Sequence, residues 1–138
     1  MAIRSHVTTG ARCAVALCVF MLLSIPLLAE DVSLATPEDA YDALVKVSET
    51  KDVELFKSLQ SEKLAKRMTA DWMIADGVMS AAEYIEKVPK SEPRINGDEA
   101  VFSKDYPDGE RIKTYSIMFR KENDRWMFDG YKSSSRFK

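Results

Sequence analysis

Cysteine and histidine are almost absent from this chain of 138 residues, and both are confined to its beginning. The two cysteines are Cys13 and Cys18, and the single histidine is His6. Beyond Cys18 no internal disulfide can form, and a zinc site would lack the ligands that zinc prefers. We therefore predict no bound metal and no cofactor, and we expect the rest of the chain to be stabilised by a packed core.

Long apolar runs are missing too, apart from one short run near the beginning. It covers residues 13–28 and follows a segment that contains Arg4 and Arg12 but no acidic residue. A basic segment, a short apolar run and a small residue at its end are typical of a secretory signal peptide. A membrane-spanning helix needs about 20 apolar residues, so an uncleaved anchor is the weaker alternative. The pattern predicts a signal peptide over residues 1–29.

The predicted cleavage follows Ala29 and leaves a mature domain of residues 30–138, which would be periplasmic or secreted. Cleavage after Ala35 is the alternative, because the residues before it are smaller, although this site lies beyond two acidic residues. Neither Cys13 nor Cys18 follows the small residues of a lipoprotein signal, so no lipid is expected.

No stretch of the mature domain concentrates charge of one sign. All 22 acidic residues lie in it, against 18 of the 20 Lys and Arg, which gives 18 − 22 = −4. The two signs are interspersed, whereas a nucleic-acid-binding protein needs at least a basic patch or stripe. We therefore expect no nucleic-acid partner, and contact with a membrane only through the signal segment.

The first part of the mature domain has helical spacing and clear helix starts. Thr36 is a good N-cap and Pro37 suits the first helical position, which predicts a helix over residues 36–49. Asp52 and Ser61 can each cap a further short helix.

A longer helical segment follows over residues 70–88. The Asp76-Gly77 pair inside it is a turn signal, which predicts an interruption, with Ser80 capping the second part. Pro89 and Pro93 end the helical half of the domain.

The second half alternates apolar and polar residues, as strands do. Turn signals divide it at Asn96-Gly97, at the YPDG segment (106–109), where a four-residue loop over residues 107–110 is expected, and at Asn123-Asp124. Helices followed by antiparallel strands indicate an α+β fold with the helices on one face of the sheet.

The Asn123-Asp124 turn also sets the register, because it pairs Glu122 with Arg125. A slip of one residue would turn every following side chain to the wrong face. This register makes Trp126 the anchor of the core, on a face with Ala100, Tyr115 and the other predicted core residues. The predicted structural core residues are Phe102, Ile117, Phe119, Trp126 and Phe128.

Three segments resemble the nuclear-transport-factor-2-like superfamily, and within it small exported bacterial families of unknown function. They read TPEDAYDAL (36–44), GDEAVF (97–102) and MFRKENDRWMFDG (118–130). The resemblance implies one domain over residues 30–138 with a cystatin-like cone. In such a cone, N-terminal helices pack in the concave face of a bent antiparallel sheet of about four strands and can enclose a pocket.

The resemblance leaves function open, because the superfamily includes ketosteroid isomerases and dehydratases as well as binding and assembly domains. Large amphipathic side chains on the inner side of the cone could line a pocket, and ordinary core packing is the alternative. The predicted ligand-binding residues are Trp72, Tyr84, Tyr41 and Tyr115.

We predict an exported, non-catalytic domain that binds a small apolar ligand in its cone, or a protein partner through its sheet. Val101 and Met127, on the outer face of the sheet, could support such a partner or a homodimer. The alternative is a small acid–base enzyme, isomerase-like or dehydratase-like, that uses Tyr with Asp or Glu. Asp71 and Asp129 supply the residue type but match no motif, so the sequence identifies no catalytic residue.

Overall fold

The computed structural model describes residues 32–138, in which four helices precede four strands. The predicted signal peptide, residues 1–29, lies outside the described residues. The helices are α1 (Pro37–Thr50), α2 (Val53–Leu59), α3 (Glu62–Arg67) and α4 (Asp71–Lys87). The strands are β1 (Arg94–Asn96), β2 (Glu99–Asp108), β3 (Arg111–Glu122) and β4 (Arg125–Phe137).

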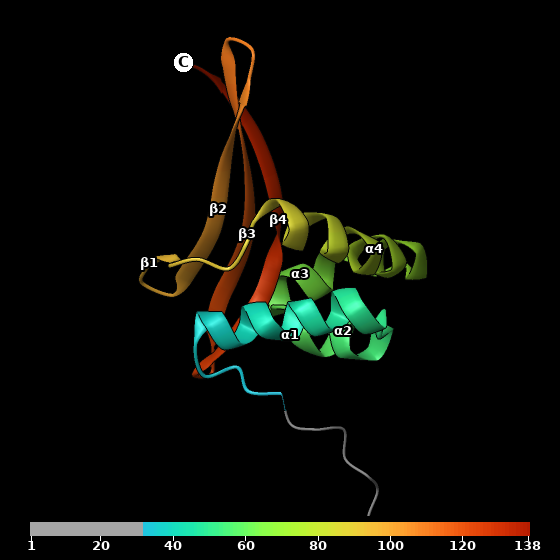
Figure 1. Cartoon of the computed structure of the whole chain (residues 1–138). Coiled ribbons are helices and arrows are strands. Elements are labelled where there is room, and N and C mark those ends of the chain that lie inside the picture. The colour runs from blue at the N-terminus through green and yellow to red at the C-terminus, as the bar shows by residue number, and fades with distance from the viewer. Residues whose placement is uncertain (1–31) are drawn as a thin grey trace, which may run out of the picture. The chain divides into compact units, whose positions relative to one another are not determined.

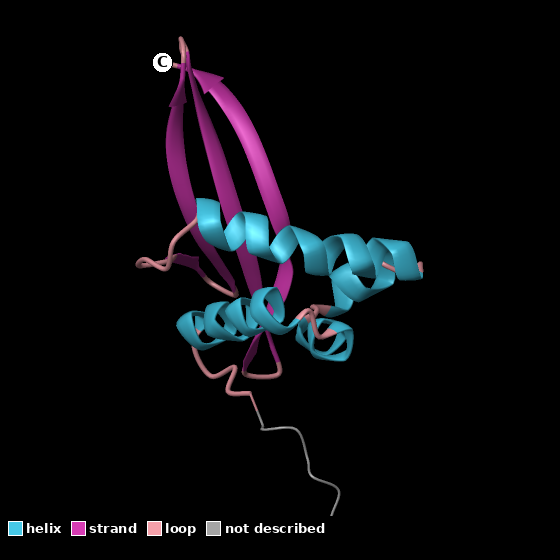
Figure 2. Ribbon diagram, turned by 45° about the vertical axis from the view of Figure 1, so that its right-hand side comes forward, coloured by secondary structure: helices cyan, strands magenta, loops and turns pink. Residues whose placement is uncertain are grey.

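The four strands form one antiparallel sheet in the order β1-β2-β3-β4, and the helices contact it through β3 and β4 (Figure 1). Figure 2 shows that α1 and α4 cross one half of the sheet, while the far ends of β2, β3 and β4 extend beyond them. The predicted α+β architecture is confirmed. Within residues 32–138, no helix is both long enough and apolar enough to cross a membrane.

The three predicted helix starts are confirmed by their capping hydrogen bonds. The Thr36 side chain accepts from the Asp39 N–H at 3.1 Å, which begins α1. Asp52 and Ser61 accept in the same way from the N–H three residues ahead, at 3.0 and 3.1 Å, and begin α2 and α3. Each cap satisfies a backbone donor that has no partner within its helix.

The predicted interruption at Asp76-Gly77 is wrong, because α4 is continuous from Asp71 to Lys87 and Ser80 lies inside it. Gly77 faces the core at very close range. A Cβ atom at this position would lie 2.7 Å from Phe56 Cζ and 2.8 Å from Met68 Cε. This glycine therefore makes room for a neighbouring helix instead of ending its own.

The register of the last hairpin is confirmed. Glu122 pairs with Arg125 and Phe119 with Phe128, and the two turn residues both have positive φ, 50° at Asn123 and 60° at Asp124. Two such residues form the tight turn whose twist matches that of the flanking strands.

Beyond Phe128 the register shifts by one residue, so Met118 pairs with Gly130 and Ile117 with Tyr131. This bulge leaves Asp129 unpaired and packs Tyr131 against the core on the helical face of the sheet. Nothing in the alternating pattern predicted it, because a bulge changes which residues share a face.

The turn between β2 and β3 is shorter than predicted. Asp108 pairs with Arg111, so the loop is residues 109–110, and Pro107 belongs to β2. Gly109 has a φ of 59°, which suits a two-residue turn. The pairing moves by two residues, an even number, and for this reason Phe102 keeps its predicted face.

The first turn also differs from the prediction. It lies at residues 97–98, one position later than expected, and the short strand β1 precedes it.

The core lies between the helices and the facing half of the sheet. All five predicted core residues are buried, with exposed fractions of 0–6%. β4 is an edge strand, and its free edge is covered next to the core. There the Trp126 N–H donates to the Leu34 carbonyl, and the Ser61 N–H donates to the Phe128 carbonyl. The edge of β4 nearest the helices therefore keeps its backbone groups satisfied.

Candidate functional site

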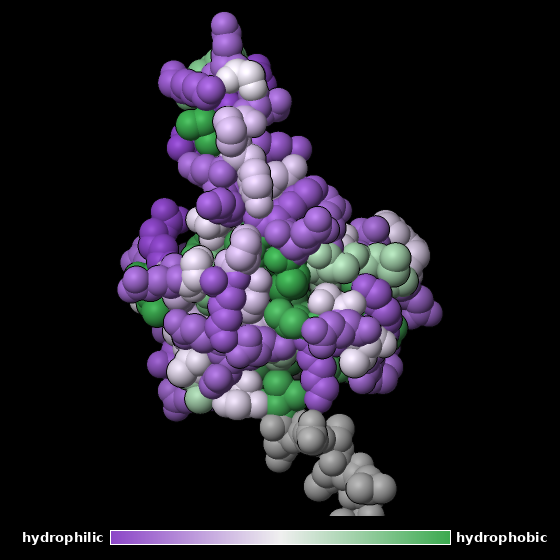
Figure 3. Space-filling model, in the orientation of Figure 1, coloured by the Kyte–Doolittle hydropathy of each residue, from purple (hydrophilic) through white to green (hydrophobic). Residues whose placement is uncertain are grey.

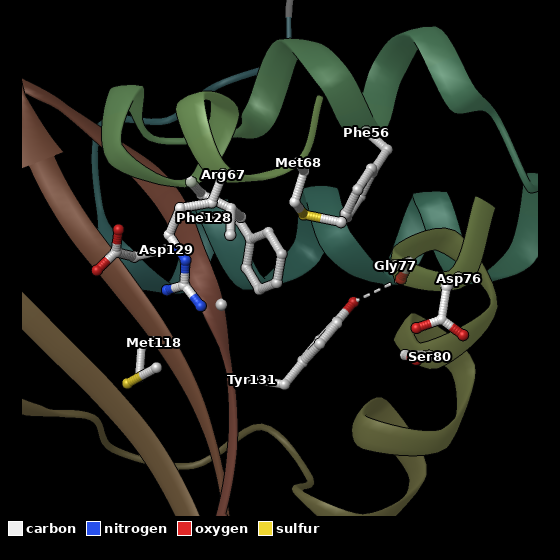
Figure 4. Close-up of a pocket in the computed structure, with 12 residues that line it drawn as sticks. Phe56, Arg67, Met68, Asp76, Gly77, Ser80, Met118, Phe128, Asp129 and Tyr131 are labelled. Atoms are coloured by element: carbon white, nitrogen blue, oxygen red, sulfur yellow. Dashed lines mark hydrogen bonds between the residues drawn. The ribbon is translucent and has the colours of Figure 1, made fainter. Parts of the chain in front are cut away.

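A hollow of about 170 Å³ lies between α2, α3, α4 and β4 (Figure 4). Its inner wall is apolar and consists of Phe56 from α2, Leu64 from α3, Met68 and Phe128. The polar residues that line it include Arg67 and Asp76, which are exposed, and Ser80, which is half-buried. The hollow thus has the character of a small ligand site, apolar inside with a few polar groups at its mouth.

Two glycines line the hollow. Gly77 lets Phe56 and Met68 pack so closely against α4 that a Cβ there would clash with both. Gly130 lies in the bulged part of β4 with a φ of 132°, a conformation that residues with a Cβ rarely adopt. Larger residues at either position would reduce the hollow or strain the backbone that forms it.

Tyr131 crosses the hollow from β4 to α4. Its hydroxyl donates to the Gly77 carbonyl at 3.1 Å, and its ring stacks on Tyr84 with centroids 4.5 Å apart. Burial, and secondarily the nearby Tyr84, raises the pKa of Tyr131 far above the ordinary value for tyrosine. Tyr131 therefore keeps its proton at neutral pH and acts as a hydrogen-bond donor, not as a base.

The raised pKa of Tyr131 predicts that the domain loses stability in alkali. Tyrosine in the unfolded chain loses its proton near pH 10, while folded Tyr131 keeps it at higher pH. The stabilisation is complete below pH ~10 and decreases as the pH rises toward the folded pKa, by at most about 1.4 kcal/mol per pH unit for one group.

We expect urea unfolding between pH 8 and 11 to show a steeper loss for the wild type than for Tyr131→Phe, which cannot titrate at this position. Equal slopes for the two proteins would contradict the burial of this phenol.

The Asp129 carboxylate is already engaged, although the residue lines the hollow. The buried Ser61 hydroxyl donates to Asp129 Oδ1 at 2.5 Å, and Arg120 Nε lies 3.6 Å from Asp129 Oδ2. Figure 4 shows the carboxylate pointing away from the aromatic side chains of the hollow. Asp129 thus ties α3 to β4 and to the outer face of the sheet.

The structure brings two of the four predicted ligand-binding residues together. Tyr84 and Tyr115 meet edge to face with centroids 5.9 Å apart, and Tyr84 also stacks on Tyr131. Tyr41 is buried elsewhere in the core, where its hydroxyl donates to the Val88 carbonyl at 2.8 Å. Trp72 is 71% exposed. None of the four lines the hollow, so their role in binding stays a prediction.

Tyr115 lies between two lysines near the end of α4. Lys87 Nζ is 4.5 Å and Lys113 Nζ is 5.0 Å from the centroid of its ring. Hydrogen bonding to Lys113, and after it to Lys87, holds the pKa of Tyr115 below the ordinary tyrosine value. Lys87 also pairs with Glu83, so this surface cluster combines one ion pair with two lysine–ring contacts.

The outer face of the sheet carries a second, wider hollow of about 400 Å³. Hydroxyl and charged side chains dominate its lining, and its only apolar members are Val101 and Met118. Arg136 pairs there with Asp105 at 3.0 Å. Val101 and Met127 are both half-buried on this face. Binding of a protein partner or a second copy through the sheet stays a prediction.

Sequence reasoning missed the residues that form the hollow. The sequence alone assigned no role to Phe56, Met68 or Tyr131. The helical spacing of Phe56 indicates that it is buried. It does not indicate that Phe56 packs against Gly77, because the two residues meet only in the folded chain.

In the described part of the chain, no group of three or more His, Cys, Asp and Glu side chains could hold a metal ion. The chain matches no protein-family model, no curated protein and no solved structure.

Proposed function

We propose that the domain is a non-catalytic binding module that takes a small apolar ligand, or the apolar end of a longer one, into the hollow between α2–α4 and β4. The observation that carries this proposal is the apolar inner wall formed by Phe56, Leu64, Met68 and Phe128. A volume of about 170 Å³ suits a ligand near the size of benzene, which an apolar cavity of about 150 Å³ can bind.

The groups around the hollow favour binding over acid–base catalysis. A catalytic acid or base must exchange its proton near the working pH. Tyr131 is held protonated by burial, and the Asp129 carboxylate is engaged by Ser61 and Arg120. The enzyme alternative would therefore need an acid or base other than Tyr131 and Asp129.

The nuclear-transport-factor-2-like family and export of the protein belong to the same proposal. Helices that precede the sheet and pack on one of its faces agree with the cone that the resemblance implies. In an exported protein without cysteine in the mature domain, this packing would replace disulfides as the source of stability.

We expect benzene, toluene or indole to raise the melting temperature, because a ligand that binds only the folded state stabilises it. At a concentration of 100 times the dissociation constant, the gain is about 2.7 kcal/mol. The test variant is Ser80→Phe, whose ring would occupy the mouth of the hollow without removing a core side chain.

Ser58→Phe is the matched control, since Ser58 is exposed on α2 and does not line the hollow. The proposal predicts a shift in the wild type and the control, and a smaller or absent shift in Ser80→Phe. Absence of a shift with all three probes, or an equal shift in Ser80→Phe, would refute it.

A further inference from the structure

The outward side of α4 presents apolar residues to solvent. Trp72 is 71% exposed and Met79 is 64% exposed, and in the described part of the chain no other helical large hydrophobic residue exceeds 39%. They lie seven residues apart, two helical turns along the same face. Ala75 and Ala82, both exposed, continue the series three residues after each. These four residues form the α4 stripe, and Figure 3 shows hydrophobic surface over α4.

The α4 stripe is separate from the face by which α4 joins the core. That buried face consists of Ile74, Gly77, Val78 and Ala81. A helix that packs on one face normally carries polar and charged residues on the others. A second, exposed apolar face on the same helix needs another explanation, and a contiguous exposed apolar patch is typical of an interaction site.

The spacing of the α4 stripe fits a partner helix. Intervals of three, four and three residues are those of a coiled-coil seam, in which side chains of one helix insert between those of the other. Large and small residues alternate along it, so Ala75 and Ala82 leave room for a partner's side chains beside Trp72 and Met79. Trp is also one of the residue types enriched among those that dominate binding energy at interfaces.

Acidic residues border the α4 stripe on one side and at its ends. Asp76 and Glu83 flank it on one side, and Asp71 and Glu86 lie near its two ends, all four exposed. The one basic side chain of α4, Lys87, pairs with Glu83. Complementary charge at the flanks selects a partner whose own flanking residues are Lys or Arg.

The same acids disfavour other occupants. An antiparallel pair of α4 helices from two copies would bring Asp76 and Glu83 against acidic residues of the second copy, and a parallel pair would oppose Glu86 to itself. Like charges in such positions repel. An anionic membrane surface would be repelled as well.

We propose that the α4 stripe docks an amphipathic helix of a partner protein that carries basic residues beside its apolar seam. This inference is independent of the hollow, because no residue of the α4 stripe lines it.

The test uses a synthetic helical peptide of three heptads, with Leu at the two seam positions, Lys at the flanking positions and no aromatic residue. Its binding should shift the emission of Trp72 to shorter wavelength, because the other tryptophan, Trp126, is already buried. Calorimetric titration should show at least tenfold weaker binding for Trp72→Ala and for Met79→Ala, with unchanged melting temperatures.

Phe137→Ala is the matched control variant, because Phe137 is similarly exposed, at 68%, but lies on β4. It should bind the peptide as the wild type does. A scrambled peptide of the same composition and a peptide with Glu in place of Lys should both bind at least tenfold more weakly.

Three results would overturn the proposal. The first is equal affinity of Trp72→Ala and the wild type, or of the scrambled and helical peptides. The second is a homodimer in sedimentation experiments that Trp72→Ala abolishes, which would assign the stripe to a second copy. The third is a Trp72 emission shift on anionic vesicles without peptide.

Discussion

Replacing Trp126 with Ala is expected to lower the free energy of unfolding by about 3–5 kcal/mol, as for other large aromatic side chains removed from a core. Trp126 is 6% exposed on the helical face of β4, next to the hairpin turn. Its backbone N–H binds the Leu34 carbonyl, and Lys121, its partner across the ladder, holds Nζ 5.9 Å from the centroid of its ring. Loss of the ring would thus open a cavity where the N-terminal segment, the helices and the sheet meet.

Urea unfolding of the mature domain measures this effect. Lys132→Ala is the control on the same strand, because Lys132 is exposed and its substitution should cost less than ~0.5 kcal/mol. Comparable losses from the two substitutions would mean that Trp126 is not part of the core, and that the register of β3 and β4 differs from the one described here.

The features that the sequence predicted correctly depend on residues close together in the chain. Thr36, Asp52 and Ser61 cap helices by binding an N–H only three residues away. The Asn123-Asp124 turn needs only two residues that accept positive φ, and it fixes the pairing of the strands on either side. Because such interactions are local, a single sequence is enough to place them.

The features that it predicted wrongly, or missed, depend on contacts between distant segments. Gly77 is locally a turn signal, but it lies inside α4, where Phe56 and Met68 pack so closely that a Cβ would clash with them. The bulge beside Gly130 moves Tyr131 to the helical face, which no alternation pattern can show. Each case is a tertiary contact that outweighs a local preference.

Trp72 illustrates the same limit for the candidate site. The α4 sequence contains two apolar series, one through Ile74, Val78 and Ala81 and the other through Trp72 and Met79. Periodicity detects both, but it does not tell which one faces the sheet. The structure buries the first and exposes the second, so the residue expected to line a pocket lies on the surface.

Gly77→Ala is expected to destabilise the domain by about 1–3 kcal/mol, the usual cost of inserting an extra carbon into a packed core. In an exposed helix the same change would stabilise by up to about 1 kcal/mol, because Ala favours the helix more than Gly does. The contacts of the added Cβ decide whether the net change in stability is a loss or a gain. Met68 Cε would lie 2.8 Å from this atom, but it is the end of a flexible side chain and can move. The Phe56 ring would lie 2.7 Å from it and is fully buried.

A double-mutant cycle with Phe56→Leu separates the steric conflict from the helix preference. If the ring of Phe56 is the obstacle, Gly77→Ala should cost less in the Phe56→Leu background than in the wild type. Asp76→Ala, at the exposed neighbouring position of α4, tests helix preference without the clash and should change stability by no more than ~0.5 kcal/mol.

If Gly77→Ala stabilised the wild type in urea unfolding, α2 and α4 would not approach each other this closely. The same variant should weaken binding of benzene or indole, because the new methyl group would displace Phe56 and Met68, which line the hollow.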